Sequence, residues 1–112
     1  MESTRLKKVS RLLQKELADI FQRENKNILP GKMITVTVVR VSSDLSLAKV
    51  YLSVFPKEKD EDYIKLFNEY KNPLRNELGH RIRNQVRKIP ELAFYLDDTL
   101  DYIDNIDRLL KK

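Results

Sequence analysis

The sequence predicts an α+β domain in which a three-stranded mixed sheet carries helices on one face. Two patterns predict this class, because apolar residues recur every three or four positions in some segments and alternate in others. The chain has 112 residues, a length that usually forms one domain around one hydrophobic core. We therefore expect a single domain over residues 1–112, with its core at about 4–96 and a helical tail at about 97–112.

The N-terminal segment has the pattern of an amphipathic helix. From Thr4 to Gln22, apolar side chains are spaced three or four residues apart, and Ser3 or Thr4 can cap the first turn. Pro30 and Gly31 then give a strong turn signal. The sequence therefore predicts a helix over residues 4–22, followed by a turn.

Two strands are predicted next, joined by the short polar connection SSDLS into an antiparallel hairpin. In residues 33–41 the alternation gives a core face made of Ile34, Val36 and Val38. In residues 44–55 it gives a core face made of Ala48, Val50, Leu52 and Val54. The opposite phase of that second strand, expected on the open face of the sheet, contains Lys49, Tyr51 and Ser53.

Beyond Pro56 the apolar period becomes helical. A second helix is predicted up to Lys71, with an apolar face of Tyr63, Leu66, Phe67 and Tyr70. Asn72 suits an N-cap and Pro73 the first helical position, so a third helix is expected there, with an apolar stripe of Leu74, Leu78, Ile82, Val86 and Ile89. Pro90 ends that helix, and LAFYL at residues 92–96 predicts a third strand, which the helical crossover allows to lie parallel to the second. A short final helix is expected from about Thr99.

The composition argues against several classes of protein. The absence of cysteine excludes disulfides and thiolate metal sites, and one histidine without a second such ligand is not expected to bind a metal. No apolar run approaches the roughly 20 residues of a membrane span, and the N-terminus lacks the apolar region of a secretion signal, so we expect a cytoplasmic protein. No nucleophile with a base and no phosphate-binding glycine loop is found, so we expect neither an enzyme nor a cofactor or small-molecule substrate.

Positive charge is concentrated in particular segments. The net charge is +5, and residues 73–90 contain five basic residues against one acidic residue. Residues 91–112 contain three basic residues against six acidic ones, and the aspartates there are expected to form a solvated face: Asp97, Asp98, Asp101, Asp104 and Asp107. A localised basic surface suggests a polyanionic partner.

Helical placement of the charged residues predicts two basic faces that could bind RNA phosphates. On the third helix the outer residues are Asn76, His80, Arg83, Asn84 and Arg87, flanked by Arg81 and Lys88. On the first helix the outer residues are Lys7, Lys8, Arg11 and Lys15. The alternative for both faces is an ordinary solvated helix surface, which would carry similar residues. A separate and less favoured RNA contact is stacking of bases on Tyr51 and Phe55.

Four blocks of sequence occur in a specific order: TRLKKVSRLLQKELADIF, ITVTVVRVSSDLSLAKVYLSVF, ELGHRIR, and IPELAFYLDD followed by DYIDNIDRLL. In these blocks the sequence resembles bacterial ribosome-binding factor A along nearly its whole length, most specifically from Val41 to Tyr51. The resemblance implies a type II KH fold and a monomer that binds the free small (30S) ribosomal subunit and its 16S rRNA. It also implies a role in late maturation, in processing of the 16S rRNA 5′ end and in growth in the cold.

The sequence departs from ordinary KH domains at the loop that clamps nucleic acid. Gly31 and Gly79 are its only glycines, so no Gly-x-x-Gly loop exists. The resembled family has an Ala-x-Gly kink there, and the equivalent is predicted at Tyr70, Lys71 and Asn72, followed by Pro73. Asparagine tolerates the left-handed conformation, so the kink is expected to be kept.

Two other functions fit parts of the sequence. A general single-stranded RNA chaperone without ribosome specificity would have the same basic faces. A protein adaptor would instead bind ribosomal proteins through the acidic tail. Association with free small subunits favours the assembly factor, and RNase-resistant association favours the adaptor.

Overall fold

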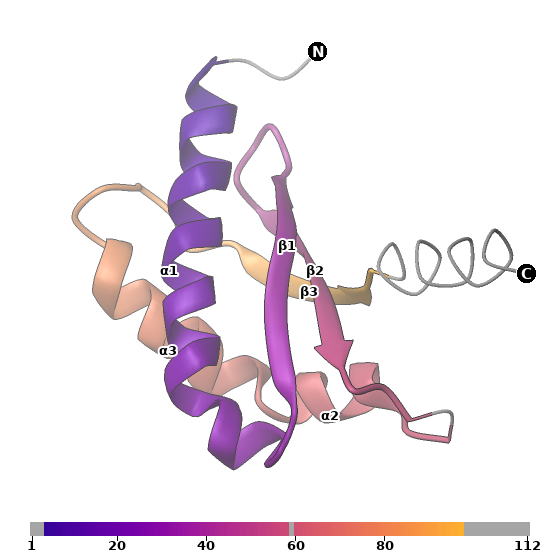
Figure 1. Ribbon diagram of the computed structural model, residues 1–112. Helices are drawn as coiled ribbons and strands as arrows, with labels where there is room; N and C mark the ends of the chain where they lie inside the picture. The colour runs from indigo at the N-terminus through magenta and orange to yellow at the C-terminus, as the bar shows by residue number, and fades with distance from the viewer. Residues whose placement is uncertain (1–3, 59, 98–112) are drawn as a thin grey trace, which may run out of the picture.

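The computed structural model describes residues 4–58 and 60–97. The elements, in chain order, are α1 (Thr4–Ile28), β1 (Met33–Val41), β2 (Leu47–Phe55), α2 (Tyr63–Glu69), α3 (Lys71–Ile82) and β3 (Glu91–Leu96) (Figure 1). This is the predicted order, and the α+β class is confirmed. The expected final helix and the aspartates after Asp97 lie outside the described residues.

The sheet has the predicted mixed topology, with the strand order β1-β2-β3. β1 and β2 are antiparallel, whereas β2 and β3 are parallel. Helices α1 and α3 pack against each other, and all three helices pack on the sheet from the same side (Figure 1). The predicted core face of β2 is confirmed, because Ala48, Val50 and Leu52 have no solvent exposure. An aromatic cluster of Phe21, Phe67 and Phe94 extends this core.

The predicted face of β1 is wrong in its second half. Ile34 and Val36 are buried, but the register with β2 shifts between Val36 and Val38. This bulge adds one residue, so the core-facing positions become Val39 and Val41, and Val38 is 38% exposed. A bulge depends on the pairing of two strands, and alternation within one strand does not reveal it.

Ser53 also differs from the expectation for the open face. It lies on that face, opposite Thr35, yet it is buried. Just beyond β3, the Asp97 backbone N–H donates to the Leu52 carbonyl at 2.8 Å. The Asp97 carboxylate accepts from the Thr37 hydroxyl at 2.7 Å, so this side chain reaches from the β3 side of β2 to β1. Part of the open face near the middle of β2 is therefore covered.

The ends of all three helices differ from the prediction, and α2 ends at Glu69 instead of Lys71. α1 continues beyond Gln22 to Ile28, because Ile28 is buried against the core and extends the apolar stripe by nearly two turns. α3 ends at Ile82 instead of Ile89, and residues 83–90 form a loop. Val86 and Ile89 lie in this loop, which folds back so that both side chains pack on the core. Their spacing in the sequence therefore resembles that of a helix although the helix has ended.

The Arg75 guanidinium fixes the end of this loop. It donates to the Ile89 carbonyl at 2.7 Å and to the Pro90 carbonyl at 3.0 Å. These hydrogen bonds join α3 to the residues that immediately precede β3. The charged residues between Ile82 and Pro90 therefore stand on a loop whose course is set by tertiary contacts.

Candidate nucleic-acid interface

The first half of α1 contains only basic charges. From Thr4 to Lys15 the charged residues are Arg5, Lys7, Lys8, Arg11 and Lys15, and all five are exposed. The opposite face of the helix is held in the core by residues such as Leu13 and Leu17. The first predicted basic face is therefore present, and the structure adds Arg5 to it. Arg5 lies one residue before the apolar stripe. Its closeness to Lys7 and Lys8 in the sequence could have indicated that it belongs to the same face.

The second predicted face is not a helix face. Asn76 and His80 do lie on the exposed side of α3, but Arg83 caps its C-terminal end. Asn84, Arg87 and Lys88 lie in the loop after the helix, where all three are exposed. Placing these residues at helical intervals was wrong because α3 has already ended.

The loop brings two of these cations to α1. A hollow of about 610 Å³ is lined by seven residues: Arg5, Leu6, Ser43, Asp44, Leu45, Arg87 and Lys88. They come from the start of α1, from the β1–β2 loop and from the α3–β3 loop, which lie in the same half of the molecule (Figure 1). Cations from two segments far apart in the sequence, Arg5 and the Arg87–Lys88 pair, thus surround one concave surface.

Asp44 is the one acidic residue of this hollow, and it is engaged by its own loop. Its carboxylate accepts hydrogen bonds from the Ser46 hydroxyl at 2.7 Å and the Ser42 hydroxyl at 2.8 Å. These hydrogen bonds lower the pKa of Asp44 to about 2. They also hold the tight turn in which Leu45 has a φ of 60°. Asp44 therefore shapes the wall of the hollow, and the three cations give it a net positive charge.

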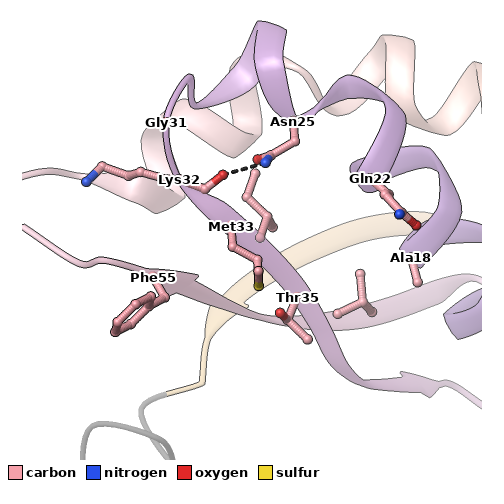
Figure 2. Close-up of a pocket in the computed structure, with 10 residues that line it drawn as sticks. Ala18, Gln22, Asn25, Gly31, Lys32, Met33, Thr35 and Phe55 are labelled. Atoms are coloured by element: carbon pink, nitrogen blue, oxygen red, sulfur yellow. Dashed lines mark hydrogen bonds between the residues drawn. The ribbon is translucent and has the colours of Figure 1, made fainter.

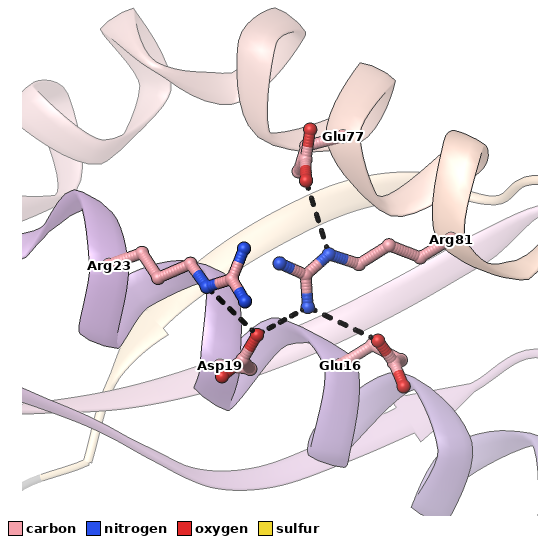
Figure 3. Close-up of polar contacts among 5 residues, drawn as sticks. All are labelled: Glu16, Asp19, Arg23, Glu77 and Arg81. Carbon is pink, nitrogen blue, oxygen red and sulfur yellow. Dashed lines mark hydrogen bonds and ion pairs between the residues drawn. The ribbon is translucent and has the colours of Figure 1, made fainter.

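Arg81, predicted to flank the second basic face, is not one of the exposed cations. Its side chain is 17% exposed and turned toward α1, where it pairs with Asp19 at 2.6 Å and Glu16 at 3.3 Å (Figure 3). It also pairs with Glu77 on its own helix at 3.2 Å. The hydrogen bond between Arg81 and Asp19 lowers the pKa of Asp19 and raises the pKa of Arg81. Arg81 thus joins α1 to α3, a role that the sequence prediction missed.

The kink between α2 and α3 lies at Tyr70, the first of the residues predicted for it, but without the left-handed asparagine that was expected. Tyr70 alone separates the two helices, with φ −98° and ψ 4°, and its hydroxyl donates to the Asn27 carbonyl at 3.0 Å. Lys71 and Asn72 are already helical, so Asn72 is neither the N-cap nor left-handed. Pro73 is tolerated inside the first turn, where backbone N–H groups have no helical partner. The kink thus needs neither glycine nor a positive φ.

Two of the predicted alternatives can be placed. Tyr51 stacks on Tyr95 across the sheet, with ring centroids 5.3 Å apart, whereas Phe55 at the strand end is 70% exposed. Base stacking by Tyr51 and Phe55 stays a prediction. Within the described residues no helix is long and apolar enough to cross a membrane, and no group of acidic or histidine side chains could hold a metal ion.

Sequence comparison decides the family. A model of the ribosome-binding factor A family matches residues 5–110. The chain belongs to this family. A ribosome-binding factor A of Cytophaga hutchinsonii is 48% identical over 112 residues, covering 100% of this chain and 84% of the relative. That of Christiangramia forsetii is 47% identical over 111 residues, covering 98% of this chain and 85% of the relative. The family is named for binding ribosomes and not for a reaction.

Solved structures of ribosome-binding factor A share the fold. The crystal structure of the factor from Thermus thermophilus aligns with a TM-score of 0.68 and 25% identity, covering 81% of this chain and 94% of that one. A homology model of the Thermus thermophilus factor, fitted into the cryo-EM map of a 30S–RbfA complex, aligns with a TM-score of 0.63 and 28% identity. It covers 79% of this chain and 90% of that one. The latter relative is therefore seen on the small ribosomal subunit.

Proposed function

We propose that this chain is a ribosome assembly factor that binds the free small (30S) ribosomal subunit through its 16S rRNA. It acts as a cytoplasmic monomer without a cofactor, assists late maturation and processing of the 16S rRNA 5′ end, and supports growth in the cold. The 30S complex of the related factor supports the choice of particle. The family resemblance motivates the maturation and cold-growth roles.

The observation that carries this proposal is the convergence of Arg5, Arg87 and Lys88 around one hollow, beside the wholly basic first half of α1. A concave surface with several exposed cations matches the phosphates of a folded RNA backbone, and each phosphate neutralised releases condensed counterions. Arginine adds bidentate hydrogen bonds to phosphate oxygens. This surface, defined by Arg5, Lys7, Lys8, Arg11, Lys15, Arg83, Arg87 and Lys88, is here called the basic surface. Asn76 and His80 on α3 are proposed as polar contacts at its margin.

The carboxylates of α1 do not cancel this charge. Glu16 and Asp19 follow Lys15 in α1, and both carboxylates pair with Arg81 at the contact with α3. Charges separated by more than about 8 Å are largely screened at physiological salt. The basic surface therefore acts locally, and the position of a cation matters more than the net charge of the chain.

A pair of double charge reversals tests this proposal. Arg87→Glu with Lys88→Glu changes the hollow, whereas Lys26→Glu with Lys65→Glu makes the same charge change at the end of α1 and on α2, in the other half of the molecule (Figure 1). All four residues are exposed. We expect the first variant to lose about tenfold or more in affinity for purified 30S subunits, and the second to lose about twofold or less. Equal losses would refute the basic surface as the site.

Salt dependence and competition separate the proposal from a general RNA chaperone. Affinity for 30S subunits should fall with salt by a log–log slope of about 0.7–0.9 per phosphate contacted, and the Arg87/Lys88 variant should have a slope shallower by one to two such contacts. Unrelated single-stranded RNA should compete weakly. Competition as strong as that of 16S rRNA fragments would favour the general chaperone.

A further inference from the structure

A groove between α1 and β1 lies apart from the basic surface. It has a volume of about 690 Å³, and Figure 2 shows its walls. One wall is four consecutive residues of β1, from Met33 to Val36. The other wall contains Ala18, Gln22 and Asn25, which are spaced four and three residues apart and so share one face of α1. The groove is thus bounded by a helix on one side and a strand edge on the other.

β1 is the outer strand of the sheet, since the described strands lie in the order β1-β2-β3. The Lys32 carbonyl accepts a hydrogen bond from the Asn25 side-chain amide, so it faces α1. Backbone groups of a strand alternate between its two edges, so those of Ile34 and Val36 also face the groove. These N–H and C=O groups have no neighbouring strand among the described residues.

Side-chain amides of α1 close both ends of this edge and leave its middle open. Asn25 binds the Lys32 carbonyl at one end, and Gln14 donates to the Thr37 carbonyl at 3.1 Å at the other. Between them on the helix stand Ala18, which is too short to reach the strand, and Gln22, whose amide makes no hydrogen bond to it. Proteins usually block exposed strand edges with charges, bulges or covering elements. Here the blocks flank an uncovered stretch of four residues, about 13 Å long.

The chemistry of the groove selects its occupant. Its walls are amide, methyl and hydroxyl groups, and the one charged residue, Lys32, turns its ammonium away to the Pro56 carbonyl at 2.8 Å and to Glu58 at 3.3 Å (Figure 2). At the Lys32 end, Met33 and Phe55 are 64% and 70% exposed and form an apolar rim. An RNA backbone would bring unneutralised phosphates here, whereas an uncharged extended peptide would satisfy the strand edge.

We propose that this groove binds an extended segment of another protein, which adds to the sheet as a fourth strand beside β1. The segment is uncharged over about four residues, pairs its backbone with Ile34 and Val36, and rests an apolar side chain on Met33 and Phe55. Strand addition of this kind takes its affinity from main-chain hydrogen bonds and its specificity from alternate side chains. This contact is additional to RNA binding and does not depend on it.

The test uses the full chain labelled with ¹⁵N and a blocked five-residue peptide of alternating threonine and valine. We expect the peptide to shift the amide signals of Ile34 and Val36. At ten times its dissociation constant it should slow their hydrogen exchange about tenfold, since protection grows as one plus the ratio of ligand to dissociation constant. The same peptide N-methylated at every residue should have no effect, because neither of its edges can then donate the amide hydrogen bonds of a strand pair.

Two variants at one position provide the control. Ala18→Gln adds an amide that is long enough to hydrogen-bond the open edge as Gln14 does, and it should abolish the peptide-induced shifts. Ala18→Ser keeps the small side chain and should bind as the native chain does. Both should retain salt-dependent affinity for 30S subunits, so failure here is distinguishable from failure of the proposed RNA contact.

Several results would overturn the proposal. These are no shift at millimolar peptide, shifts away from β1, equal binding of the N-methylated peptide, or undiminished binding by Ala18→Gln. A second copy of this chain is the competing occupant. Concentration-dependent shifts of Ile34 and Val36 without peptide, with a doubled mass in sedimentation, would show self-pairing and would also overturn it.

Discussion

Replacing Arg81 by methionine should destabilise the domain much more than the same change at Arg83. Methionine keeps much of the apolar stem and removes the charge. Arg81 lies at the α1–α3 contact with three carboxylates within 3.3 Å, whereas Arg83 is exposed just beyond the end of α3. Without the guanidinium, Glu16 and Glu77 lose their counter-charge, and Asp19 keeps only the exposed Arg23 at 3.4 Å.

The magnitude follows from how far the ion pairs are exposed. Exposed pairs contribute about 0–1 kcal/mol, whereas truncating one partner of a buried pair costs about 3–5 kcal/mol. The Arg81 side chain is 17% exposed, but those of its partners Glu16, Asp19 and Glu77 are 23%, 44% and 50% exposed. The cost should therefore lie between the two limits, at about 2 kcal/mol. Arg83→Met should cost less than about 0.5 kcal/mol.

Urea denaturation followed by circular dichroism measures both free energies of unfolding. The difference should also depend on pH. The folded-state pKa of Asp19 is depressed below its ordinary 3.8, so its stabilising contribution is present above about pH 4 and is lost as the pH falls through the folded pKa. The effect of Arg81→Met should accordingly shrink in acid. Equal unfolding free energies for the two variants at pH 7 would refute the structural role of Arg81.

Further substitutions test the sheet and α3. Leu52→Ala should cost about 3 kcal/mol in urea melts, because Leu52 is fully buried in the central strand, whereas exposed Lys49→Ala should cost less than about 0.5 kcal/mol. The reverse ranking would mean that the strand phase is inverted. Gly79→Ala should stabilise the domain by about 0.8 kcal/mol, because the new Cβ would meet Ile89 Cγ1 at an ordinary 3.6 Å and alanine favours a helix interior. A lower melting temperature would show that the contact with Ile89 is too tight.

The order and type of the elements follow from the sequence because the signals are local. Alternation in residues 47–55 and helical spacing from Thr4 each depend on neighbours a few positions apart. The core face of β2 was predictable for the same reason, since a central strand without a bulge keeps one phase throughout. The basic first half of α1 also follows from sequence, because its cations lie on a helix whose buried stripe is unambiguous.

Tertiary contacts decided the features that periodicity does not encode. Val86 and Ile89 keep a helical spacing but pack from a loop, so the position of Arg87 beside Arg5 depends on how that loop folds back. In the sequence Arg81 cannot be distinguished from an exposed cation, because Glu16 and Asp19, which pair with it, lie on α1. Val38 became exposed through pairing with β2.

The groove beside β1 is likewise a property of two packed elements. The sequence by itself determined which residues could form helices, strands and a charged surface, because these depend on short-range spacing. The tertiary structure alone decided where α3 stops, which cations meet and which strand edge stays open, because each depends on contacts between residues far apart in the chain.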